Sequence, residues 1–133
     1  MREKVIFAVF VLLGLLIVFV LFFPAIDHHP DVPVLRAMTE ATAIATATKA
    51  YHIEYGAFPT GSPAQIAATL SGQNSNHIVF IEMQRKSIGS DGQFIDPWGQ
   101  AYALAFDGGT NVIVRSAGKD KVFGTPDDVE AER

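Results

Sequence analysis

Residues 34–55 read VLRAMTEATAIATATKAYHIEY, a stretch rich in alanine that contains neither glycine nor proline. Within it, side chains suited to one helix face recur at spacings of three and four residues. These residues are Ala37, Ala41, Ile44, Thr48, Tyr51 and Tyr55. Gly56 follows in the position of a C-terminal cap, and Pro59 lies just beyond it. The stretch therefore predicts one long helix whose weakly apolar face must be held by packing, because its threonines lower helix propensity.

The residues after this helix predict a second short helix and a small sheet. Residues 62–70, SPAQIAATL, begin with Ser62 as an N-cap and Gln65 three residues later, which is the pattern of a capping box. Strands are predicted over residues 77–82, 101–106 and 111–116. The sequence DGGT at 107–110 favours a β-hairpin between the last two. A long helix on a small antiparallel sheet gives an α+β fold for the domain, residues 34–133.

The N-terminal part of the chain has the pattern of a membrane anchor. Val5–Phe23 is an uncharged apolar run, and as a helix it would be about 28 Å long, close to the hydrocarbon thickness of a bilayer. Arg2 and Lys4 precede it, which favours a cytoplasmic N-terminus and an extracytoplasmic domain. We expect a single-pass transmembrane helix over residues 1–26 and a linker over residues 27–33. The alternative is a cleaved signal peptide, but the run is longer than a signal core and PAIDHHP offers no small-x-small cleavage site.

The composition excludes several classes of function. The 133 residues include no cysteine, so disulfides, thiol catalysis and thiolate metal sites are absent. Beyond the first 26 residues the chain carries 8 basic and 13 acidic side chains, and an acidic domain without a basic stripe argues against a nucleic-acid partner. There is no nucleophile elbow, phosphate loop or dinucleotide fingerprint, so we expect neither an enzyme nor a small-molecule substrate. A small domain without disulfides often needs a metal or a partner subunit for stability.

The tetrapeptide DPWG at 96–99 predicts a type I turn, because aspartate, proline and glycine suit its first, second and fourth positions. The turn would hold Trp98 beside the following strand. Trp98 has two interpretations, a residue that stacks on a ligand and a side chain that fills the edge of a small core, and we favour the second.

The four histidines offer a weaker metal hypothesis. His28 and His29 lie next to each other in the linker, near Asp27 and Asp31, and imidazole is a ligand for transition metals. Adjacent histidines on a flexible connector rarely converge on one ion, so we do not favour a metal site there. His52 and His77 are isolated in the sequence, and we interpret them as surface or interface residues.

Residues 116–129 read SAGKDKVFGTPDDV, with three carboxylates at Asp120, Asp127 and Asp128. Calcium takes six to eight hard oxygen ligands, and a bent loop can supply them from side chains and backbone together. The glycines allow the chain to fold back and bring the carboxylates together, and a divalent cation would remove their repulsion. The spacing is not that of an EF-hand. A solvated acidic tail remains the alternative interpretation.

Three motifs occur in a specific order after the apolar run: YxxxYGxFPT at 51–60, DPWGxxY at 96–102 and SAGxDxxFGTxDD at 116–128. This order resembles the major pseudopilin of the bacterial type II secretion system, which has a type IV pilin-like fold. The similarity covers most of residues 34–129. It implies a structural subunit that supports protein export, anchored in the bacterial inner membrane with its domain in the periplasm. Its partners would be copies of itself or other pseudopilins.

The same resemblance implies a calcium site in the C-terminal loop. Asp120, Asp127 and Asp128 then become side-chain ligands, and Ser116, Val122 and Thr125 become backbone carbonyl donors.

The N-terminus departs from the pattern of this family. Prepilins carry a short basic leader, a Gly-Phe-type cleavage point and a glutamate five residues into the mature helix. Met1–Phe23 contains no Gly-Phe pair and no acidic residue within the apolar run. The departure motivates a second hypothesis, in which the chain is an uncleaved, membrane-tethered binding module derived from a pseudopilin and not incorporated in a filament.

Overall fold

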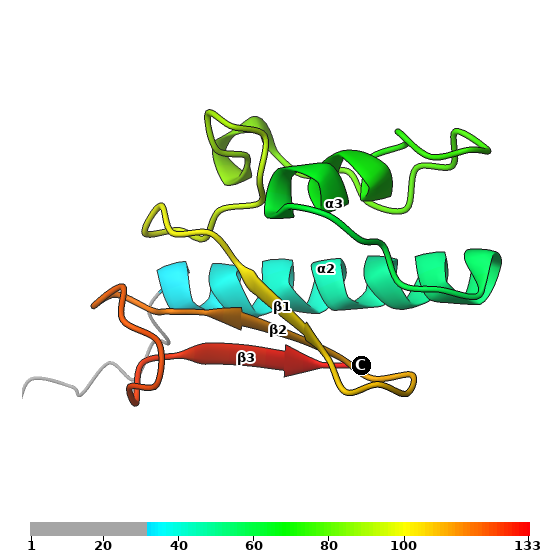
Figure 1. The fold of residues 1–133 in the computed structure, drawn as a ribbon. Coiled ribbons are helices and arrows are strands. Elements are labelled where there is room, and N and C mark those ends of the chain that lie inside the picture. The colour runs from blue at the N-terminus through cyan, green and yellow to red at the C-terminus, as the bar shows by residue number, and fades with distance from the viewer. Residues whose placement is uncertain (1–31) are drawn as a thin grey trace, which may run out of the picture.

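The computed structural model describes residues 32–133, in which one long helix packs against a three-stranded antiparallel sheet (Figure 1). The elements are, in chain order, α2 (Val32–Tyr55), α3 (Pro63–Leu70), the 3-10 helix η1 (Arg85–Ser87), β1 (Ala103–Phe106), β2 (Val112–Ser116) and β3 (Val129–Glu132). The predicted α+β class is confirmed. Helix α2 contacts β2, β3 and α3, so it forms the middle layer of the domain.

The predicted long helix is confirmed, and it begins two residues earlier than expected. Pro33 lies in its first turn, where the missing amide hydrogen costs no helical bond. The buried residues of α2 are Ala37, Ala41, Ile44, Ala45, Ala47 and Thr48, which are mostly small and allow a close approach to the sheet. At the other end Gly56 has a φ of +72°, and its amide donates to the carbonyl of His52 at 2.8 Å, as expected of a cap.

Helix α3 begins with the predicted capping box. The amide of Gln65 donates to the hydroxyl of Ser62 at 3.3 Å, and the amide of Ser62 donates to Oε1 of Gln65 at 2.8 Å. Ala67 and Leu70 on the other face of the helix are buried in the core. The cap thus fixes where the helix starts, and the apolar face fixes how it packs.

The sheet has the order β1-β2-β3, with both pairs antiparallel. The predicted hairpin is confirmed, and Leu104 lies opposite Val114 in its register. Alternate residues of the central strand point into the core, namely Val112, Val114 and Ser116. In β3 the buried residues are Val129 and Ala131, and glutamates fill the positions between them.

The strand predicted over residues 77–82 is wrong. The amides of Phe80 and Ile81 both donate to the carbonyl of Leu70, at 2.9 and 3.2 Å, and the amide of Ile78 donates to the side chain of Asn74. This segment is therefore extended but bonded to the end of α3, outside the sheet. The third strand is instead β3, where no strand was predicted.

A polar network joins α2 to the segment that follows α3. Glu40 accepts the hydroxyl of Tyr102 at 2.9 Å, the hydroxyl of Ser87 at 2.6 Å and Nε of Arg36 at 2.8 Å. Burial raises the pKa of the Tyr102 phenol, and the charge of Glu40 raises it further. The network fixes the position of the 3-10 helix on α2 through paired polar groups.

The predicted anchor, residues 1–26, and all but the last two residues of the predicted linker lie outside the described residues. Within residues 32–133, no helix combines the length and the apolar character that crossing a membrane requires.

Candidate functional site

The candidate metal loop, residues 117–128, connects β2 to β3 at the end of the domain where α2 begins (Figure 1). A cavity of about 370 Å³ lies at this junction. It is lined by Pro33, Val34, Trp98, Lys119 and Asp127. The metal loop, the first turn of α2 and the DPWG turn therefore meet at one place.

The DPWG turn is confirmed, since the amide of Gly99 donates to the carbonyl of Asp96 at 3.0 Å. The Asp96 side chain does more than shape the turn. It is 2% exposed, and its Oδ1 accepts the amides of Trp98 at 3.0 Å and Gln100 at 2.9 Å. Its Oδ2 accepts the hydroxyl of Ser116 at 2.6 Å. This buried link was missed by sequence reasoning, because nothing in a turn motif indicates a partner 20 residues away.

The link continues from Ser116 into the metal loop. The amide of Gly118 donates to the Ser116 hydroxyl oxygen at 3.1 Å. Gly118 has a φ of +67°, and a Cβ there would lie 2.6 Å from Oδ2 of Asp127 and closer still to the Asp127 carbonyl oxygen. Glycine is thus required both by the backbone conformation and by the close approach of Asp127.

Asp127 is held by two donors from the loop. Its Oδ1 accepts the Thr125 hydroxyl at 2.6 Å, and its Oδ2 accepts the amide of Asp120 at 3.0 Å. The Thr125 bond and, after it, the Asp120 amide hold the pKa of Asp127 below its ordinary value. The stabilisation from this carboxylate is therefore present above its unfolded pKa and is lost as the pH falls through the lower folded value.

The other two aspartates are also bonded to loop amides. Oδ1 of Asp120 accepts the amide of Val122 at 2.8 Å, and Oδ2 of Asp128 accepts the amide of Gly124 at 2.8 Å. The remaining oxygen of Asp128, Oδ1, is buried and has no hydrogen-bond partner. A buried carboxylate oxygen without a donor is costly, so this atom would gain from a cation.

The predicted ligands fit calcium in their chemistry. Hydrogen bonds link Asp127 to Thr125 and to the amide of Asp120, and Thr125 to the carbonyl of Val122. Asp128 is bonded instead to the amide of Gly124, and Ser116 lies at the end of β2 with its hydroxyl committed to Asp96. All the predicted donors are hard oxygen atoms, as calcium prefers, and Oδ1 of Asp128 has no hydrogen-bond partner. Over residues 32–133, however, no three acidic or histidine side chains are arranged as a metal-holding group. The calcium site remains a prediction that would need the carboxylates to turn from the loop amides.

Two of the four histidines lie in the described region. Nδ1 of His52 is buried without a hydrogen-bond partner, and the ring stacks on Phe58 with the centroids 4.3 Å apart. His77 is exposed, with a φ of +54°. His28 and His29 lie outside the described residues. Trp98 is half-buried between α2 and the metal loop, where it lines the shared cavity.

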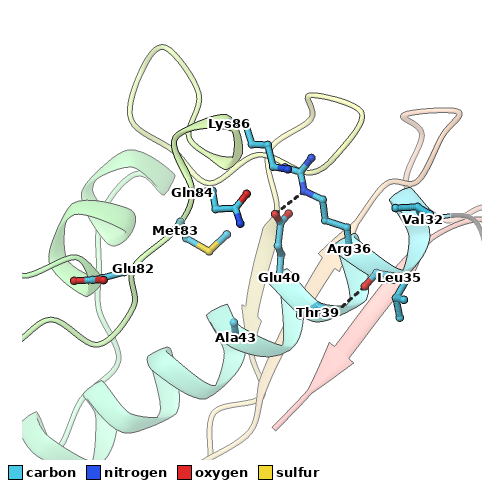
Figure 2. A pocket seen from close by; sticks show the side chains of 10 residues that line it. All are labelled: Val32, Leu35, Arg36, Thr39, Glu40, Ala43, Glu82, Met83, Gln84 and Lys86. Atoms are coloured by element: carbon cyan, nitrogen blue, oxygen red, sulfur yellow. Dashed lines mark hydrogen bonds and ion pairs between the residues drawn. The ribbon is translucent and has the colours of Figure 1, made fainter.

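A groove of about 400 Å³ lies between the first half of α2 and the segment at 82–86. Figure 2 shows Met83 and Gln84 facing the Arg36–Glu40 ion pair across it. Its wall thus combines apolar surface with charges of both signs. Sequence reasoning predicted only a strand ending at residue 82 here, so the groove was not predicted.

Replacing Asp96 with asparagine is expected to lower the free energy of unfolding by about 1–2 kcal/mol, because an amide nitrogen would face the Ser116 hydroxyl in place of a carboxylate oxygen. Chemical denaturation of the full chain in detergent would measure it. Asp91→Asn is the matched control, since Oδ1 of Asp91 accepts only one exposed amide, at 3.5 Å. Equal stability of the two variants would contradict the role of Asp96.

No protein-family model matches the sequence. No curated protein matches it either. Among solved structures, the chain is similar to the crystal structure of the major pseudopilin from the type 2 secretion system of enterohaemorrhagic Escherichia coli, with 21% sequence identity and a TM-score of 0.46. The match covers 74% of this chain and 81% of that one.

Proposed function

We propose that this chain is a structural, pseudopilin-like subunit of a type II secretion assembly, which is related to the type IV pilus, and that it supports protein export. The observation that supports it best concerns the two motifs behind the sequence resemblance. The DPWG turn and the C-terminal loop form one hydrogen-bonded unit, because Asp96 accepts from Ser116 and Ser116 accepts from Gly118. Hydrogen bonds between the two motifs thus give a structural reason for their joint occurrence in the chain.

The proposal includes a calcium ion in the metal loop. Asp120, Asp127 and Asp128 would hold it with their carboxylates, and Val122, Thr125 and Ser116 would contribute carbonyl oxygens. Bound calcium would neutralise the three carboxylates and supply a partner to the buried Oδ1 of Asp128. In a domain without disulfides, such a site would stabilise the connection between β2 and β3.

The proposed role is structural and not catalytic. The buried polar side chains Asp96 and Ser116 are bonded to each other, and Ser87 donates to Glu40. These groups are therefore committed to holding the fold together. The exposed apolar residues Met38 and Ile53 of α2 offer surface for contact with neighbouring subunits.

Photo-crosslinking in native membranes would test the assembly. A photoreactive residue at Met38 or Ile53 of the full chain is expected to give a ladder of adducts with itself or with other pseudopilins, because these exposed side chains would lie between subunits. The same label at Asp91, an exposed polar position, serves for comparison. A single adduct with one unrelated protein at every position would contradict the proposal.

A single adduct with one unrelated protein would support the second hypothesis, in which the chain is an uncleaved, membrane-tethered module that binds a peptide or an envelope component. The observation that favours it is the groove of Figure 2, where an apolar wall lies beside the Arg36–Glu40 pair. A label at Met83, on the groove wall, would then give the single adduct most strongly.

A further inference from the structure

Exposed apolar side chains gather at the end of the domain where α2 begins. Val32 and Leu35 lie in the first turns of α2 and are 78% and 56% exposed. Val122 and Phe123 lie in the metal loop and are 56% and 47% exposed. Exposed apolar side chains that gather in one part of a protein surface can serve as a contact surface.

The two pairs belong to the same end of the molecule. The cavity formed by Pro33, Val34, Trp98, Lys119 and Asp127 joins the start of α2 to the metal loop. Figure 1 shows the orange loop between β2 and β3 beside the first, cyan turn of α2. We call Val32, Leu35, Val122 and Phe123 the proximal surface.

The length of the chain between the apolar run and α2 limits how far the proximal surface can lie from the apolar run. Eight residues separate Phe23, the last of the apolar run, from Val32. Fully extended they span about 28 Å at most. Ile53, near the far end of α2, lies about 32 Å further along the helix at 1.5 Å per residue. If the apolar run is in a bilayer, the proximal surface is the part of the domain that the tether keeps near the lipid.

The formal charge of the metal loop depends on whether a divalent cation is bound. Between residues 116 and 128 the chain carries two lysines and three aspartates, a formal charge of −1. A bound divalent cation would change this to +1. Anionic headgroups attract basic protein surface and repel acidic surface. The loop would therefore approach anionic lipid more readily when the cation is bound.

We propose that the proximal surface rests on the bilayer that anchors the chain, with Phe123 and Leu35 entering the headgroup region and a divalent cation strengthening the contact with anionic phospholipid. Aromatic and aliphatic side chains are favourable at this depth. The inference rests on the membrane anchoring in the proposed function. It adds a lipid contact by the domain itself, which orients the far end of α2 away from the membrane.

Site-specific labelling of the full chain tests the proposal, because the chain has no cysteine of its own. Phe123→Cys, Leu35→Cys and the matched control Ile53→Cys, which is also exposed at 77%, would each carry a polarity-sensitive fluorophore. The variants are reconstituted in vesicles of phosphatidylethanolamine and phosphatidylglycerol, with and without nitroxide-labelled lipid. Thermal melting of each labelled variant verifies its fold.

We expect nitroxide lipid to reduce the fluorescence at positions 123 and 35 by about twofold with calcium present, and to leave position 53 unchanged. Chelator should weaken the quenching at position 123. Equal quenching at positions 123 and 53, or a blue shift at 123 and 35 without quenching, would overturn the proposal, the latter indicating a protein partner. Vesicle flotation distinguishes a failure of the membrane anchor from a failure of the lipid contact. A chain that does not float with the vesicles refutes the anchor and with it the lipid contact. A chain that floats but shows no quenching refutes the lipid contact alone.

Discussion

Removing calcium from the full-length chain in detergent is expected to lower its Tm by about 10–15 °C. A ligand that binds only the folded state at 100 times its Kd stabilises it by about 2.7 kcal/mol, and for a domain of this size each kcal/mol shifts the Tm by several degrees. The physical reason is the buried Oδ1 of Asp128, which has no donor, together with the two other carboxylates in the same loop. Circular dichroism melts with excess calcium and with EGTA would measure the shift.

Two variants test whether the increase in Tm with calcium depends on the loop. Asp128→Asn should remove most of the calcium-dependent increase, because the amide offers calcium a neutral and weaker ligand. Asp91→Asn removes the same charge from an exposed turn and should keep the full increase. Identical melting curves in calcium and EGTA for the unaltered chain would mean that the loop is stable without a cation, and the calcium proposal would then be wrong.

The parts of the fold that sequence predicted well are local. The long helix, the capping box at Ser62 and the β1–β2 hairpin each depend on residues within a few positions of one another. The strand predicted over residues 77–82 failed because its alternation also suits an extended segment, and the nearby carbonyl of Leu70 supplied the bonding partner. Strand β3 was not predicted because VEAE is short and charged at alternate positions, and only pairing with β2 gives it a buried face.

In the candidate site, too, sequence identified local features but not the contacts between distant residues. Its carboxylates were identified from the sequence, and the structure places Asp120 and Asp127 in contact, with the amide of one bonded to the side chain of the other at 3.0 Å. The support beneath them was not identified, because the bond between Ser116 and Asp96 joins two motifs only after the sheet has formed. Sequence therefore identified the acidic loop that is proposed to bind a cation, but not the bond that positions it.

Gly118→Ala is expected to lower the free energy of unfolding by about 3–5 kcal/mol, the largest effect of any single change considered. A left-handed backbone at a residue with a Cβ costs about 1–2 kcal/mol. The new methyl would also lie 2.6 Å from Oδ2 of Asp127 and closer still to the Asp127 carbonyl oxygen, a backbone atom that no rotamer change can move. The loop must then shift, which breaks the bonds from Gly118 to Ser116 and from Asp120 to Asp127, each worth about 1 kcal/mol.

Gly124→Ala is the matched control in the same loop. Gly124 has a φ of +91°, also a left-handed conformation, but a Cβ there would meet no atom within 4 Å. It should therefore lose only about 1–2 kcal/mol from backbone strain, so the difference between the two variants isolates the contact with Asp127. Urea unfolding of both variants in calcium would measure that difference. Equal losses would show that the loop accommodates the methyl without moving Asp127, and the tight packing of Gly118 against that carboxylate would then contribute nothing to stability.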